Sequence, residues 1–71
     1  MYPITNVKKE LSKREKEVLK LLTKGFNNSE IAQELIISEH TSRAHVKSIL
    51  EKLDARNRTT AAVIAITRNL V

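Results

Sequence analysis

The sequence predicts an all-α fold: a single domain of four helices that contains a helix-turn-helix motif. Apolar residues recur at helical spacing in four separate segments, and a Ser or Asn suited to N-capping precedes each segment. One Gly and one Pro among 71 residues argue against a turn-rich β fold. A chain of this length allows one domain with a modest hydrophobic core.

The first predicted helix begins after a segment without periodicity. Residues 1–10 contain Pro3 and form no apolar stripe, so we interpret them as a tail or linker and place the domain at 11–71. Ser12 and Glu15 have the spacing of a capping box, and Gly25 is suited to a left-handed stop. These signals predict a helix over 13–24.

The next two helices are joined by a short turn. Asn27 with Glu30 predicts the start of a two-turn helix over 28–35, and Ser38 predicts the start of a longer helix over 39–53. In the longer helix one narrow apolar stripe is formed by Val46, Ile49, Leu50 and Leu53. At 100° per residue, Arg43, Ala44 and Lys47 lie to the side of this stripe and behind it, which predicts one packed face and one basic face.

The fourth helix is predicted over 58–69, with Asn57 as its cap. One face, expected to pack on the other helices, holds Ala61, Ala62, Ala65 and Ile66. The opposite side is expected to leave an exposed aliphatic strip consisting of Val63 and its neighbours Thr60, Ile64 and Thr67. Such a strip suggests a partner surface.

Charge and composition narrow the function classes. Lys and Arg outnumber Asp and Glu by 13 to 8, a net charge of +5 that favours polyanionic partners, nucleic acid first. The chain has no Cys, and His40 and His45 lie about 140° apart on one helix, so neither a metal nor another cofactor is expected. No nucleophile–base pair or glycine-rich phosphate loop is present, which argues against an enzyme. There is neither a bilayer-length apolar run nor a signal-peptide pattern, and the expected location is the cytoplasm, with no membrane partner.

A short helix, a tight turn and a longer helix with a basic outer face form the helix-turn-helix pattern. An α-helix fits the major groove of DNA, where the base edges offer a distinguishable code of donors and acceptors. The small side chain of Ala32 suits a close crossing of the two helices. Pattern and charge together therefore favour binding to double-stranded DNA.

Five separate blocks of the sequence closely resemble the LuxR/GerE-type (FixJ/NarL-like) DNA-binding domain, without insertions. The blocks are Leu11-Ser12-x-Arg14-Glu15-x-Glu17-Val18-Leu19, Gly25 with Asn28-x-Glu30-Ile31-Ala32-x-x-Leu35, Ile37-Ser38-x-x-Thr41-x-Arg43-x-His45-Val46, Lys52-Leu53, and Arg58-Thr59-x-Ala61. The resemblance implies a four-helix domain of a bacterial transcription regulator, whose third helix enters the major groove. Ser42 departs from the family, which places a β-branched aliphatic residue there; its hydroxyl is expected to bond to the carbonyl of Ser38.

The resemblance also implies roles for single residues. Arg43, Ala44 and Lys47 would face the bases, the two cations pairing with guanine edges or a phosphate and Ala44 touching a thymine methyl. Contacts to the DNA backbone are expected from Ser38, Thr41, Arg56, Arg58 and Asn28. The strip on the fourth helix would form a weak homodimer on DNA, reading half-sites about one helical turn apart.

Two other readings stay open. A sigma-like promoter-reading module would also bind DNA, but it would contact RNA polymerase instead of a second copy of itself. RNA polymerase is also a candidate partner of a transcription regulator. A non-DNA interaction domain would dock an acidic protein through its basic face. Two forms of the whole protein also stay open: a stand-alone regulator, and a larger regulator of which this chain is the C-terminal part.

Overall fold

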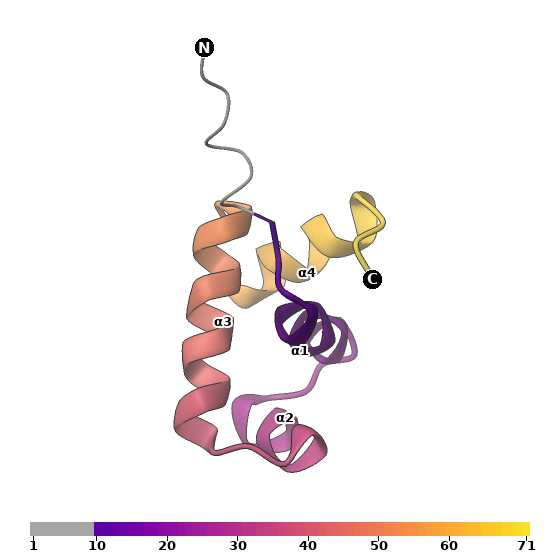
Figure 1. Ribbon diagram of the computed structural model, residues 1–71. Coiled ribbons are helices and arrows are strands. Elements are labelled where there is room, and N and C mark those ends of the chain that lie inside the picture. Colours follow the sequence, from indigo (N-terminus) through magenta and orange to yellow (C-terminus); the bar gives the residue numbers. More distant parts are fainter. Residues whose placement is uncertain (1–9) are drawn as a thin grey trace.

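The computed structural model describes residues 10–71, which form four helices and no strand. In chain order these are α1 (Lys13–Thr23), α2 (Asn28–Leu35), α3 (Glu39–Leu53) and α4 (Arg58–Thr67). In Figure 1, α3 runs along the left edge of the molecule, and α1, α2 and α4 all lie to the right of it. The predicted all-α helix-turn-helix fold is confirmed. Most of the predicted tail at 1–10 lies outside the described residues.

The helices begin where the capping signals predicted. Ser12 Oγ accepts from the Glu15 N–H at 3.1 Å, and Glu15 Oε1 accepts from the Ser12 N–H at 2.9 Å. Asn27 and Glu30 form the same reciprocal pair at the start of α2, with both bonds at 2.8 Å. The side chains at the four N-cap positions belong to Ser12, Asn27, Ser38 and Asn57. Because each cap satisfies backbone N–H groups within three residues, short-range sequence is sufficient to define these starts.

Two helices end earlier than predicted. The predicted ranges 13–24 and 58–69 are too long, since α1 ends at Thr23 and α4 at Thr67. Gly25 has a φ of +88°, as expected for a left-handed stop, but Lys24 before it is already a cap residue. After the end of α4, Asn69 adopts a φ of +59°, and the Leu70 N–H donates to the Ala65 carbonyl at 2.8 Å. Asn here takes the left-handed position that more often belongs to Gly.

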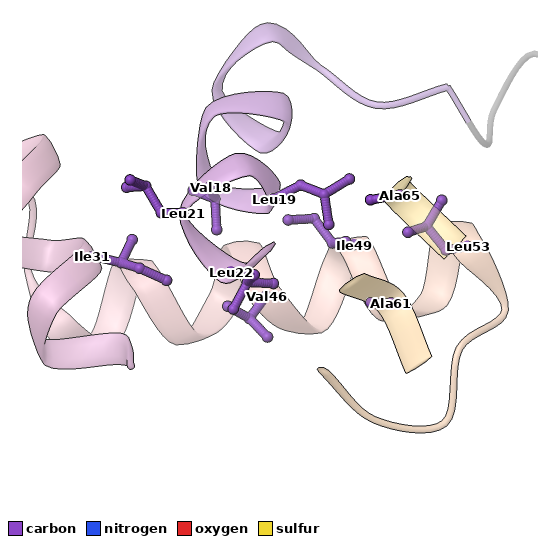
Figure 2. Close-up of a cluster of buried hydrophobic side chains, with 10 residues drawn as sticks. All are labelled: Val18, Leu19, Leu21, Leu22, Ile31, Val46, Ile49, Leu53, Ala61 and Ala65. Atoms are coloured by element: carbon purple, nitrogen blue, oxygen red, sulfur yellow. The ribbon is translucent and has the colours of Figure 1, made fainter. Parts of the chain in front are cut away.

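The core gathers side chains from all four helices (Figure 2). Its members are Val18, Leu19, Leu21, Leu22, Ile31, Val46, Ile49, Leu53, Ala61 and Ala65. The alanines let α4 approach α1 closely, and Leu50 completes the predicted stripe of α3 as a partly buried residue at the edge of the core. The stripe therefore decides which side of α3 faces inward, and with it which side is left for a partner.

The packing of α4 corrects one prediction. Ile66 was expected on the packed face but is 65% exposed, whereas Ile64, assigned to the outer strip, is partly buried against the core. The helix is rotated so that Ala61 and Ala65 point directly inward. Ile64 then lies about 80° from the middle of the buried face and Ile66 about 120° from it, at 100° per residue. The exposed aliphatic side of α4 consequently consists of Val63 and Ile66.

Ser42 corrects a second expectation. Its side chain is fully buried, and its hydroxyl has no hydrogen-bond partner among the described residues. The carbonyl of Ser38, the expected acceptor, instead receives the backbone N–H of Ser42 at 3.0 Å in the ordinary helical bond. The hydroxyl thus lies on the packed face of α3 without a partner, at a cost in stability.

The turn between α2 and α3 contains an unusual backbone conformation. Ile36 has a φ of +56° and a ψ of +53°, in the left-handed region that β-branched residues rarely adopt, and it is 90% exposed. Its N–H bonds to the Ala32 carbonyl, so the residue closes α2 and redirects the chain into α3. Between residues 10 and 71, no helix has both the length and the apolar character that crossing a membrane requires.

Candidate nucleic-acid interface

The exposed face of α3 is the part of the fold best placed to meet DNA. Arg43, Ala44 and Lys47 are all exposed, while Ser42 and Val46 on the same turns are buried. In Figure 1 none of the other three helices covers the outer edge of α3. The structure therefore brings the three residues predicted to face bases onto one open helical surface.

Arg43 does not extend freely into solvent. Its Nη1 donates to Glu39 Oε2 at 3.3 Å, one helical turn earlier, and about half of each side chain is exposed. Lys47 takes part in no ion pair among the described residues. Glu39 was not among the predicted site residues, although its i,i+4 spacing to Arg43 is a recognisable signal for such a pair.

The start of α3 combines two hydroxyl side chains with a helix N-terminus. Ser38 Oγ accepts from the Thr41 N–H at 3.0 Å and donates to Thr41 Oγ1 at 2.9 Å. Ser38 is exposed and Thr41 partly buried. A helix N-terminus carries a partial positive charge and favours anions such as phosphate. The two residues predicted to approach the DNA backbone are thus joined into one capping unit.

Two other residues predicted to contact the backbone are brought together from separate helices. Arg58 Nη2 at the start of α4 donates to Asn28 Oδ1 at the start of α2, at 3.2 Å. This link across 30 residues places a guanidinium beside the N-terminus of α2. Their spacing in the sequence carries no signal of the contact.

Arg56 lies apart from that pair, in the connection between α3 and α4. It is exposed and belongs to an open hollow between α3 and the start of α4. The hollow is lined by Lys47, Leu50, Glu51, Asp54, Ala55, Arg56 and Thr60. One concave surface is therefore shared by three predicted site residues. Lys47 was predicted to read bases, Arg56 to touch phosphates and Thr60 to contact a second copy.

An ion pair between buried Glu15 and partly exposed Lys52 links α1 to α3. Glu15 Oε1 accepts from Lys52 Nζ at 2.8 Å, and Glu15 Oε2 accepts from Ser48 Oγ at 2.6 Å. Burial raises the pKa of the Glu15 carboxyl, but the hydrogen bonds from Lys52, Ser48 and the Ser12 N–H, with the charge of Lys52, outweigh it and lower the pKa to about 2. The sequence assigned Glu15 only a capping role, because its partners on α3 are 33 and 37 residues away.

Positive charge is not concentrated on α3. Residues 39–54 contain three basic and three acidic side chains, whereas residues 13–24 contain five basic and two acidic ones. The basic character of the α3 surface is therefore local, and it depends on where Arg43 and Lys47 stand relative to Glu39 and Glu51. Within residues 10–71 no three His, Cys, Asp or Glu side chains gather in a way that could hold a metal ion.

The predicted strip on α4 is only partly exposed. Val63 is 57% exposed and Thr67 is exposed, while Thr60 and Ile64 are partly buried. Ile66, which the sequence analysis placed on the packed side, adds to the exposed surface beside Val63.

Comparison with known proteins shows the class to which this domain belongs. The family described as bacterial regulatory proteins, luxR family, matches residues 9–65. The chain belongs to this family, and its four helices are the family's helix-turn-helix domain. This family assignment confirms the resemblance found in the sequence.

Individual relatives agree with this assignment. Over 61 residues the chain is 46% identical to the uncharacterized transcriptional regulatory protein YhcZ and 48% identical to the transcriptional regulatory protein LiaR, both of Bacillus subtilis (strain 168). It is 43% identical over 61 residues to the response regulator protein VraR of Staphylococcus aureus (strain NCTC 8325 / PS 47). Each match covers 86% of this chain but only 28% of YhcZ and 29% of LiaR and VraR. The chain thus spans less than a third of the length of these relatives.

Proposed function

We propose that this domain binds double-stranded DNA in a sequence-specific manner, with α3 in the major groove, as the DNA-reading part of a bacterial transcription regulator. The observation that carries the proposal is the division of α3 into two faces. Val46, Ile49 and Leu53 hold one face in the core, and Arg43, Ala44 and Lys47 stand exposed on another. A helix so anchored presents its outer side chains as a rigid unit.

In this proposal Arg43 donates to a guanine edge, Lys47 to a guanine or a phosphate, and Ala44 touches a thymine methyl group. Phosphate contacts come from the starts of α2, α3 and α4 and from the connection before α4. The residues assigned to them are Ser38, Thr41, Asn28, Arg56 and Arg58. The distribution fits the usual division of labour, in which backbone contacts position the protein and base contacts specify the sequence.

The test begins by selecting bound sequences from random duplex DNA, followed by titration at several salt concentrations. Replacement of Arg43 by Ala is expected to cost about 1–3 kcal/mol of binding free energy and to relax preference at one base position. Lys47→Ala is expected to weaken binding and to reduce the salt slope by about 1 if its contact is to phosphate. Arg14→Ala is the matched control, since Arg14 is also exposed and paired with a nearby glutamate, at 3.1 Å, but lies on α1.

The control variant should keep the selected sequence unchanged. A wild-type domain that binds all duplexes alike would contradict sequence-specific recognition. Equal effects of Arg43→Ala and Arg14→Ala on base preference would contradict the placement of α3. Affinity for an acidic protein without measurable affinity for DNA would favour the interaction-domain reading instead.

We further propose that two copies meet through α4 when bound to DNA, with Val63 and Thr67 at the centre of the contact and Thr60 and Ile64 at its edge. The exposed area is small, so the association is weak in the absence of DNA. Val63→Asp should then abolish cooperative binding to paired half-sites while leaving affinity for an isolated half-site unchanged. Equal losses on both DNAs would instead indicate damage to the fold.

RNA polymerase is a further candidate partner of a regulator of this kind, and its binding would need a surface left free by DNA and by the second copy. A domain that acts on a bacterial chromosome works in the cytoplasm, which is the location we propose.

A further inference from the structure

An acidic side chain stands on the surface that is proposed to approach DNA. Glu39 is the first residue of α3, and about half of its side chain is exposed. A carboxylate in this position repels phosphates, and it lowers the affinity of the surface for any DNA sequence. Its presence needs a physical reason beyond helix formation.

Stability of α3 is a weak reason. A Glu in the first turn interacts favourably with the helix N-terminus, but an exposed Glu–Arg pair one turn apart adds little to the stability of a helix. The cap of α3 is already supplied by Ser38, whose Oγ accepts from the Thr41 N–H. Other helix-forming residues at position 39 would maintain the helix nearly as well.

The contact to Arg43 supplies a stronger reason. An arginine side chain has many accessible rotamers, and a free one can reach several phosphates as well as a base edge. With Nη1 held by Glu39 at 3.3 Å, the guanidinium is confined to the first turns of the exposed face. Only one of its donors is used in this way, and the others remain for a two-bond contact to O6 and N7 of a guanine.

From this geometry we infer that Glu39 is a specificity-determining residue, which positions the Arg43 guanidinium for a base edge and disfavours its alternative contacts with phosphates. The inference rests on the proposed function, because it requires Arg43 to read a base. Glu39 then lowers the affinity for random DNA but raises the ratio of specific to non-specific affinity.

The test compares Glu39→Ala with Glu51→Ala. Glu51 is an exposed acid on the same helix, three turns further on, and it forms no ion pair within residues 10–71. Both variants remove one negative charge from α3, so both should bind random-sequence duplex a few-fold more tightly at low salt. Only Glu39→Ala is expected to lower the ratio of specific to non-specific affinity, by about three- to tenfold, with the loss concentrated at the base pair whose preference depends on Arg43.

Two further measurements separate positioning from folding. Helical content and melting temperature report any loss of structure, and a merely structural role of Glu39 would not change preference at one base pair. In an Arg43→Ala background, Glu39→Ala should have no further effect on selectivity, because the side chain that it positions is gone. A persistent effect in that background would overturn the inference.

The possible failures are distinguishable. If Arg43→Ala relaxes base preference but Glu39→Ala preserves the affinity ratio, the role of Glu39 is wrong and the proposed function stands. An equal fall in the ratio for Glu51→Ala would also overturn the inference, since charge alone would then be responsible. If the wild-type domain shows no sequence preference, or Arg43→Ala leaves it unaltered, the proposed reading mode fails and the role of Glu39 fails with it.

Discussion

The buried carboxylate of Glu15 provides the sharpest test of how the fold is held together. Its side chain is only 7% exposed and receives three hydrogen bonds, from the Ser12 N–H at 2.9 Å, Ser48 Oγ at 2.6 Å and Lys52 Nζ at 2.8 Å. The perturbation we consider is Glu15→Gln, which keeps the size of the side chain and removes its charge. Lys52 then loses its ion-pair partner but is 27% exposed and can turn toward water.

The magnitude follows from the pKa of Glu15, which is lowered from 4.5 to about 2 in the folded domain. That difference corresponds to about 3 kcal/mol of stability when the carboxyl is ionised. Because the folded-state pKa is the lower one, the contribution is fully present above about pH 4.5 and is lost as the pH falls toward about 2. We therefore expect Glu15→Gln to lower the free energy of unfolding at pH 7 by about 2–3 kcal/mol, a large share for so small a domain.

The assay is urea unfolding followed by circular dichroism, at pH 7 and at intervals down to pH 2. The matched control is Glu17→Gln, since Glu17 lies on the same helix and pairs with Arg14 at 3.1 Å, but its side chain is 45% exposed. An exposed pair of this kind contributes between zero and about 1 kcal/mol. The gap between wild type and Glu15→Gln should close between pH 4.5 and 2. Equal losses for the two variants at pH 7, or a gap that does not change with pH, would refute the reasoning.

Two further predictions concern stability at single positions. Ser42→Ala should raise the free energy of unfolding by about 1 kcal/mol, because it removes a fully buried hydroxyl that has no partner in the described part of the chain; a lower urea midpoint for this variant would mean that the hydroxyl is satisfied in solution. Ile36→Asn should stabilise the domain by about 1 kcal/mol, because Asn tolerates the φ of +56° that strains a β-branched residue. Thermal unfolding measures the second effect, and a fall in melting temperature would show that the exposed Ile36 side chain makes a stabilising contact.

Much of the architecture is predictable because its causes are local. An N-cap and the helix that it starts are separated by three residues, so Ser12 with Glu15 and Asn27 with Glu30 can be recognised from the printed sequence. The inward face of α3 follows from the spacing of Val46, Ile49 and Leu53 in the same way. The exposed placement of Arg43, Ala44 and Lys47 is then a geometrical consequence, which made the candidate interface accessible to sequence reasoning.

Helix ends and the orientation of α4 were harder to predict. The sequence of α4 offers aliphatic residues and alanines on several sides, so its pattern alone does not select one rotation about the helix axis. Close packing against α1 and α3 selects the rotation that buries Ala61 and Ala65, which exposes Ile66 and partly buries Ile64. The small alanines prevail over the larger isoleucine because they permit the helices to approach closely.

By itself the sequence determined the helical class, the starts of the four helices and the side of α3 that remains outside, since each depends on residues within one or two turns. Only the tertiary structure decided the contacts between residues about 30 or more positions apart: Glu15 with Ser48 and Lys52, and Arg58 with Asn28. It also left the Ser42 hydroxyl without a hydrogen-bond partner among residues 10–71. The physical reason is that a hydrogen bond between distant segments depends on how whole helices pack, and this packing depends on all four helices together.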